Sequence, residues 1–213
     1  MILGFAGKAA SGKTTAAKHL ATVLDGEVII LPMALVLREE VENFLKACQA
    51  DEHIPLVYGC QEDKVKIFHI DRDKALKACP KWGHFITEHQ EIQNPSNQTA
   101  VTVRRILQWW GTEYRRDQDP EYWTKAWARK VESYDLTRVH ILVDDIRFMN
   151  ELEILKAEGG LIVRIIRPGF DGAGNHASET SLDGYTEWDG CILNDGSLLQ
   201  FFEKVEATIE SLG

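Results

Sequence analysis

The sequence predicts an α/β fold, with a parallel sheet of about five strands and helices on both faces of that sheet. Two observations lead to this prediction. Short, nearly continuous apolar runs alternate along the chain with longer segments of helical periodicity, a pattern typical of parallel strands that are buried on both faces. A glycine-containing turn at residues 7–14 also follows the first apolar run, where sheets of this class often bind phosphate groups.

The expected elements follow one another in a regular order. The apolar runs that predict strands cover residues 1–6, 27–31, 139–143, 161–166 and 188–193. The segments that predict helices cover residues 14–24, 37–45, 102–110, 120–131, 150–158 and 198–209. Gly26 and Gly159 follow two of these helices, at the position where a helix most often ends in glycine. Ser197 and Gln200 have the spacing of a capping box at the start of the last helix.

Two stretches depart from this alternation. Residues 49–100 combine histidines, prolines and mixed charges without a clear period, which predicts an irregular insertion. Residues 168–184 are rich in glycine, which predicts a lid. A chain of 213 residues fits one large domain that carries such additions.

Composition excludes several classes of protein. The hydrophobic fraction of 44% and the charged fraction of 27% are those of a globular chain. No apolar run approaches the roughly 18 residues that span a bilayer, so we expect no membrane partner. The formal charge of −9 argues against a nucleic-acid polymer as partner. The cysteines lack paired spacing and no secretory leader precedes them, so we expect reduced thiols in a cytoplasmic protein.

Residues 7–14, GKAASGKT, match the phosphate-loop pattern G-x-x-x-x-G-K-[ST] at every fixed position. Glycines let the backbone N–H groups of such a loop point at phosphate oxygens. Lys13 can reach the β- and γ-phosphates, and the Thr14 hydroxyl can ligate Mg²⁺. A turn without a ligand is the alternative. The predicted ATP-binding residues are Gly7, Lys8, Ala9, Ala10, Ser11, Gly12, Lys13, Thr14 and Thr15.

Four further stretches carry a resemblance to one family. They are RRILQWWGTEYRRDQDPEYW (104–123), LVDDIRFMNELEILKAEGG (142–160), IIRPGFDGAGNHASETSLDG (165–184) and ILNDGSL (192–198). Together with the phosphate loop, they resemble the phage-type deoxynucleoside monophosphate kinases. The resemblance implies a P-loop kinase-type sheet with an acceptor-binding insertion and a lid. It also implies ATP with Mg²⁺, a nucleoside monophosphate as second substrate, and a homodimer.

Several charged residues are candidates for the transfer step. Asp144 and Asp145 end an expected strand, where one of them would orient Mg²⁺ or its water shell; the alternative is that one only caps the following turn. Arg147 would touch a phosphate, or else form a surface ion pair. Arg167 opens the expected lid, where an arginine would neutralise charge on the transferring group. The predicted catalytic residues are therefore Lys13, Arg147 and Arg167.

The acceptor site is expected to be rich in arginine, because a guanidinium binds phosphate through two parallel hydrogen bonds. Arg38 is one candidate, although it could instead pair with Glu42 one helical turn away. Trp109 and Trp110 could stack on a base or belong to the core, and only one of Arg115 and Arg116 is expected to face a phosphate. The predicted acceptor-binding residues are Arg38, Arg104, Gln108, Thr112, Glu113, Arg116, His176 and Glu179.

These observations lead to one functional hypothesis and two rivals. The hypothesis is transfer of the γ-phosphoryl group of ATP to a (deoxy)nucleoside 5′-monophosphate. The first rival is a P-loop kinase that acts on another small phosphorylated acceptor, such as dephospho-coenzyme A. The second rival is a switch protein that binds ATP without phosphorylating a small molecule. Residues 194–196 would either contact the adenine of ATP or form only a turn.

Overall fold

The computed structural model describes residues 1–60, 62–88, 97–170 and 180–213. These residues form two compact units. The first unit combines Met1–Met33 with Thr124–Gly213, and the second is Ala34–Trp123. The expected insertion at 49–100 falls within the second unit, together with the residues on either side of it. Most of the expected lid lies outside the described residues.

The first unit is built on a parallel sheet, as the sequence predicts. Its strands are β1 (Ile2–Ala6), β2 (Glu27–Ile30), β5 (Val139–Ile146), β6 (Leu161–Ile166) and β7 (Gly190–Leu193). They lie in the order β2-β5-β1-β6-β7, and each neighbouring pair is parallel. All residues of β1 are buried, because β1 is the central strand and helices cover both of its faces.

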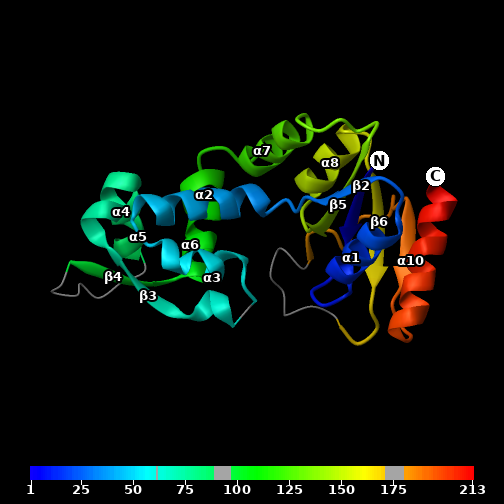
Figure 1. The fold of residues 1–213 in the computed structure, drawn as a ribbon, viewed down its shortest axis with the longest axis horizontal. Helices are drawn as coiled ribbons and strands as arrows, with labels where there is room; N and C mark the ends of the chain where they lie inside the picture. Colours follow the sequence, from blue (N-terminus) through cyan, green and yellow to red (C-terminus); the bar gives the residue numbers. More distant parts are fainter. Residues whose placement is uncertain (61, 89–96, 171–179) are drawn as a thin grey trace. The chain divides into compact units, whose positions relative to one another are not determined.

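Helices on both faces complete this unit (Figure 1). α1 (Lys13–Val23) and α10 (Leu198–Leu212) contribute Leu20, Phe201 and Val205 to the core on one face. α8 (Met149–Ala157) covers the other face so closely that a Cβ on Gly4 would lie 2.6 Å from Leu155. α7 (Tyr122–Val131) is joined to the end of β2 by a hydrogen bond of 3.0 Å from Trp127 Nε1 to the Leu31 carbonyl.

The second unit contains regular elements where the sequence predicted an irregular insertion. α2 (Leu35–Ala47) is followed by η1 (Asp51–His53), α3 (Ile54–Tyr58), η2 (Asp63–Val65), β3 (Ile67–Asp71), α4 (Arg72–Ala78), α5 (Trp82–Glu88) and β4 (Gln98–Thr102). β3 and β4 pair antiparallel. That prediction was wrong because helices of five to seven residues are too short to show a period.

α6 (Val103–Trp109) and the π-helix η3 (Trp110–Arg116) form one continuous helical stretch after β4. The Thr102 hydroxyl caps α6 by accepting a hydrogen bond of 3.3 Å from the Arg105 N–H. Trp109 and Trp110 are 2% and 5% exposed. Trp109 packs edge-on against Trp82 and Phe85. Both tryptophans are therefore core residues of this unit, and neither is a platform for a base.

No helix within the described ranges is long and apolar enough to cross a bilayer.

Candidate active site

The loop that joins β1 to α1 has the backbone geometry of a phosphate-binding loop. Gly7, Ala10 and Gly12 have positive φ angles of 149°, 59° and 111°. A Cβ on Gly7 would lie 2.4 Å from the carbonyl oxygen of Ile165, and one on Gly12 would lie 2.9 Å from the Asn194 side chain. Only glycine fits at these two positions, because a side chain would meet both backbone strain and a neighbouring atom.

Lys13 is held against this loop. Its side-chain ammonium donates hydrogen bonds to the carbonyl oxygens of Gly7 at 2.6 Å and Lys8 at 2.7 Å. The residue is only 7% exposed, and a buried ammonium is tolerated where polar partners replace water. Thr14 and Thr15 follow in the first turn of α1 and are exposed. The predicted ATP-binding residues thus form one loop with its cation in place.

Asn194 supports the loop from the end of β7. Its side-chain amide donates to the Ser11 carbonyl at 2.9 Å, and its backbone N–H donates to the Ile166 carbonyl at 2.7 Å. The next residue, Asp195, pairs with Lys204 of α10 at 2.5 Å. Asn194 therefore orients the phosphate loop, a role that no local pattern indicates, because it joins residues 183 positions apart.

Arg167 lies beside the same loop. One of its guanidinium nitrogens, Nη1, donates to the Ala10 carbonyl at 3.1 Å, and its guanidinium carbon lies 4.0 Å from the centre of the Phe170 ring. The ammonium of Lys8 pairs with Asp183 at 2.7 Å. Arg167, which precedes the expected lid, and Asp183, near the end of that lid, therefore contact the phosphate loop.

A pocket next to Gly7 is lined by four cations. Lys8, Arg147, Arg164 and Arg167 all contribute to its wall, together with Asp183. The guanidinium of Arg164 lies 5.3 Å from the centre of the Trp188 ring, which also lines the pocket. A pocket in which cations outnumber carboxylates attracts anions such as phosphate groups. The structure thus places two of the predicted catalytic residues, Arg147 and Arg167, in one wall beside the phosphate loop.

The two aspartates at the end of β5 have different environments. Gly4 pairs with Val143, and Ala6 pairs with Ile146, so β5 contains one extra residue at Asp144 and Asp145. Such a bulge redirects side chains and is common next to active sites. Asp145 Oδ1 accepts a hydrogen bond of 2.7 Å from the backbone N–H of Met33. Asp144 is half-buried, and its carboxylate has no hydrogen bond or ion pair with the residues that the structure describes.

Glu151 stabilises the turn that follows these aspartates. Its carboxylate is 6% exposed and accepts hydrogen bonds from the backbone N–H groups of Arg147 at 2.8 Å and Phe148 at 3.1 Å. It thereby caps α8, since the first N–H groups of a helix have no partner within the helix. These hydrogen bonds fix the backbone at Arg147, just after the end of β5.

A second group of candidates lies within the other unit. Arg104, Gln108 and Thr112 recur every four residues along α6 and η3, and all three are exposed. Arg38 of α2 does not pair with Glu42, whose carboxylate binds Lys46 and Tyr58 at 2.6 Å each. Glu113 is exposed and Arg116 half-buried, while His176 and Glu179 lie outside the described residues.

Lys64 of η2 belongs to the same unit as these candidates and lies in no sequence motif. Burial, followed by the charges of Arg38 and Arg104, lowers the pKa of the Lys64 ammonium below its ordinary value. Like charges disfavour the charged form of an ammonium, which is why the two guanidinium groups act in this direction.

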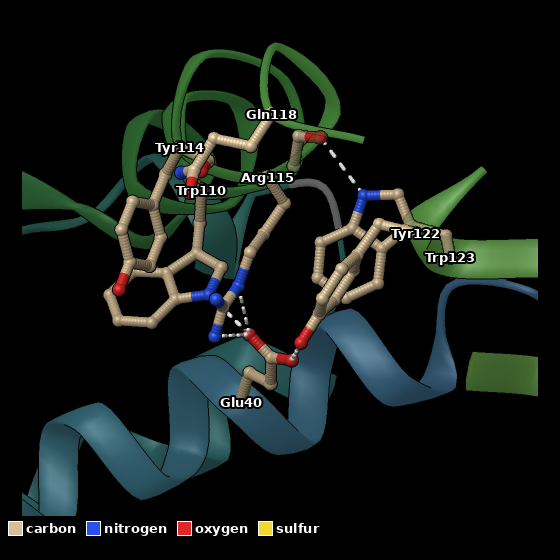
Figure 2. A network of polar contacts seen from close by, with 8 residues as sticks. Glu40, Trp110, Tyr114, Arg115, Gln118, Tyr122 and Trp123 are labelled. Carbon is tan, nitrogen blue, oxygen red and sulfur yellow. Dashed lines mark hydrogen bonds and ion pairs between the residues drawn. The ribbon is translucent and has the colours of Figure 1, made fainter. Parts of the chain in front are cut away.

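Glu40 binds Arg115, one of the two adjacent arginines (Figure 2). Its carboxylate accepts hydrogen bonds from Trp110 Nε1 at 2.8 Å, Arg115 Nε at 2.9 Å and the Tyr122 hydroxyl at 2.5 Å. The Arg115 guanidinium also stacks near the rings of Tyr114 and Tyr122. Arg115 is thus a structural residue that ties η3 to α2, which leaves Arg116 as the candidate of the pair.

Comparison with known proteins identifies the family of this chain. The family model of the deoxynucleotide monophosphate kinases matches residues 57–205, which is well over half of the chain. The chain belongs to this family. It is therefore a kinase, and the matched region runs from α3 into α10. The phosphate loop lies outside the matched region, so it is independent support for nucleotide binding.

Three relatives of this kinase carry the same description. The deoxynucleotide monophosphate kinases of Enterobacteria phage T4 and Escherichia phage RB69 are 30% and 31% identical to it over 113 and 119 residues. Those alignments cover 52% and 55% of this chain and 46% and 48% of the relatives, about half of each protein. A protein of Acanthamoeba polyphaga mimivirus, provisionally named for the same activity, is 23% identical over 99% of this chain and 97% of its own.

One solved structure covers nearly the whole chain. It is a protein of Borrelia burgdorferi B31, provisionally named a plasmid partition protein and bound to AMPPNP, with 11% identity over 99% of this chain and 98% of its own. The TM-score of 0.32 is too low to show a shared fold.

Proposed function

We propose that this kinase transfers the γ-phosphoryl group of ATP to a deoxynucleoside or nucleoside 5′-monophosphate, which yields the diphosphate and ADP. One observation carries the proposal: the phosphate loop holds Lys13 in its centre and borders a pocket walled by Lys8, Arg147, Arg164 and Arg167. Membership of the family supports the acceptor class.

The donor's phosphates would lie in the loop. Backbone N–H groups of residues 7–14 and the N-terminus of α1 would surround the β- and γ-phosphates. Lys13 would exchange its two carbonyl partners for phosphate oxygens, which are stronger acceptors because they carry charge. Asn194 would keep the loop open in this conformation through its hydrogen bond to Ser11.

The residues present fit a magnesium ion. Mg²⁺ prefers oxygen ligands and usually takes one or two from the protein, with phosphate and water completing its shell. Thr14 offers a hydroxyl and Asp144 a carboxylate that no other described residue engages. Asp145 is the weaker candidate, because its Oδ1 already accepts from the Met33 N–H. The ion would neutralise charge on the β- and γ-phosphate oxygens.

The transfer itself needs little covalent chemistry from the protein. An acceptor phosphate oxygen is already anionic, so no general base is required. The rate would come from positioning and from cations around the group in transfer. Lys13, Arg147 and Arg167 would supply these cations, because Arg147 and Arg167 lie in one pocket wall beside the loop.

The acceptor would bind to residues of the second unit. Arg38 and Arg104 would hold its phosphate, and Gln108 and Thr112 offer amide and hydroxyl groups to the base or sugar. Glu113, Arg116, His176 and Glu179 remain candidates from the family resemblance.

A coupled assay of ADP release tests this function. Each dNMP and NMP is offered with ATP and Mg²⁺, and dephospho-coenzyme A is offered in parallel. We expect one or more nucleoside monophosphates to stimulate ADP release by at least about 100-fold over ATP alone, as positioning of two reactants allows. Turnover with dephospho-coenzyme A only, or ATP binding without any acceptor-stimulated turnover, would overturn the proposal.

A further inference from the structure

We infer that the ion pair between Lys8 and Asp183 is an autoinhibitory contact, in which a carboxylate occupies a cation of the phosphate loop until a nucleotide displaces it. The inference rests on the proposed function and deepens it, since it adds a control on donor binding. The phosphate-loop pattern fixes neither residue, because Lys8 stands at a variable position of that pattern and Asp183 follows 175 positions later.

The ion pair joins the phosphate loop to a distant turn. The Lys8 ammonium lies 2.7 Å from Asp183 Oδ1 and 2.9 Å from Asp183 Oδ2, so both carboxylate oxygens bind the same cation. The side chain of Lys8 is 25% exposed and that of Asp183 is 49% exposed. Water reaches both groups, and an ion pair of this kind is weak enough to be exchanged for a better one.

Asp183 contributes the only carboxylate among the described residues that line the pocket beside Gly7. The other charged residues of that lining are Lys8, Arg147, Arg164 and Arg167. Asp183 is therefore an internal anion among cations, in the pocket where the proposed reaction needs phosphate groups. A phosphate group that enters this pocket is repelled by the carboxylate and finds the Lys8 ammonium already paired.

The fold holds the turn that carries Asp183. Tyr185 packs edge-on against Trp188, with ring centres 4.7 Å apart, and its hydroxyl donates to the Glu187 carbonyl at 2.9 Å. The Lys156 ammonium of α8 donates to the same carbonyl at 3.2 Å. These contacts tie the turn to α8, so Asp183 is positioned by the surrounding structure and not by Lys8 alone.

A nucleotide is a stronger partner for Lys8 than this carboxylate. A triphosphate carries several negative charges on oxygens that accept charge-assisted hydrogen bonds, whereas Asp183 carries one. Nucleotide binding therefore exchanges one ion pair for another and releases Asp183 to solvent. In the empty protein the carboxylate lowers the mutual repulsion of the cations around it. The contact thus stabilises the empty pocket and reduces the affinity for ATP.

Substitution of Asp183→Asn, with Asp25→Asn as the matched control, tests the inference. Asp25 is an exposed aspartate of the same unit. The 11 residues of α1 separate it from the phosphate loop, a distance of roughly 16 Å. Calorimetric titration with Mg²⁺ and AMPPNP, an ATP analogue that resists hydrolysis, measures the affinity. We expect D183N to lower the Kd by about 3- to 5-fold, the upper range for a partly exposed ion pair. D25N should change it by less than about 1.5-fold, and Asp183→Glu, which keeps the charge, should stay closer to the wild type than D183N does.

Lys8→Met supplies the second half of a double-mutant cycle, because it removes the ammonium and keeps an apolar stem. In this background, D183N should change the Kd by less than about 1.5-fold, since the carboxylate no longer has a cation to occupy. An equal gain in both backgrounds would overturn the inference, because Asp183 would then act on the nucleotide without Lys8. An unchanged or higher Kd in D183N alone would overturn it as well. Thermal unfolding of each protein checks the fold, and Asp183→Ser replaces D183N if that variant unfolds.

The titration contains no acceptor, so it separates this inference from the proposed function. If no nucleoside monophosphate stimulates ADP release, the proposed transfer has failed, and tighter binding of AMPPNP by D183N still supports the autoinhibitory contact. If nucleoside monophosphates are turned over and D183N binds AMPPNP as the wild type does, only the inference has failed. A wild-type protein that binds no AMPPNP refutes both.

Discussion

Arg115 binds Glu40 through two nitrogens, with Nε at 2.9 Å and Nη2 at 2.8 Å from the same carboxylate oxygen. The two side chains are only 26% and 19% exposed, so the pair is poorly screened by water. Trp110 and Tyr122 bind the same carboxylate. One acidic side chain therefore joins α2, the π-helix η3 and the start of α7. A π-helix is an uncommon geometry that often occurs at functional sites, and this network holds it in place.

Loss of this pair should destabilise the second unit. Glu40→Ala leaves the Arg115 charge and two N–H or O–H donors without their acceptor, so we expect a loss of about 2–4 kcal/mol in the free energy of unfolding. Urea unfolding monitored by tryptophan fluorescence measures it. Glu62→Ala, at an exposed position of the same unit, is the control and should change stability by less than about 0.5 kcal/mol. Equal stability of the two variants would show that the network contributes nothing.

Lys13→Ala should lower turnover by several orders of magnitude while the protein stays folded. The ammonium is the cation nearest the centre of the phosphate loop, and its role is to stabilise charge in the transition state. Single-turnover ADP release gives the rate, and circular dichroism with a thermal melt checks the fold. Near-normal phosphoryl transfer by this variant would remove Lys13 from the mechanism.

We expect Asp144 to bind the metal ion and Asp145 to stabilise the fold. Asp144→Ala is expected to lower kcat and to raise the Mg²⁺ concentration needed for half-maximal activity, with little change in melting temperature. Asp145→Ala should instead lower stability by about 1–3 kcal/mol, because the Met33 N–H loses a charged acceptor. Magnesium titration and thermal unfolding of both variants measure the two effects. The reverse assignment would follow if Asp145→Ala alone shifted the magnesium dependence.

Asn194→Ala should weaken ATP binding and leave the affinity for the acceptor unchanged. The side-chain amide holds the Ser11 carbonyl at 2.9 Å, so its loss lets the phosphate loop relax and should raise the KM for ATP by about 5- to 10-fold, equivalent to about one neutral hydrogen bond. Asp195→Asn alters the adjacent residue, which only pairs with Lys204 near the surface, and should leave that KM unchanged. The same KM in all three proteins would mean that the loop holds its shape without Asn194.

The sequence by itself determined the features that depend on neighbouring residues. Buried parallel strands are apolar throughout, so the five strands of the first unit could be predicted. A phosphate loop is contiguous, so the residues around Lys13 were found from their spacing alone. The capping box at Ser197 and Gln200 is equally local, and the structure shows both of its hydrogen bonds.

Only the tertiary structure decided which distant side chains meet. Glu40 binds Arg115 across 75 residues of chain, and Asn194 binds the Ser11 carbonyl across 183 residues. Hydrophobic periodicity reports which face of an element is buried but not which element covers it. The helices of residues 49–100 have two turns or fewer, too few to show a repeat in the sequence. Their packing is therefore decided only when the chain has folded.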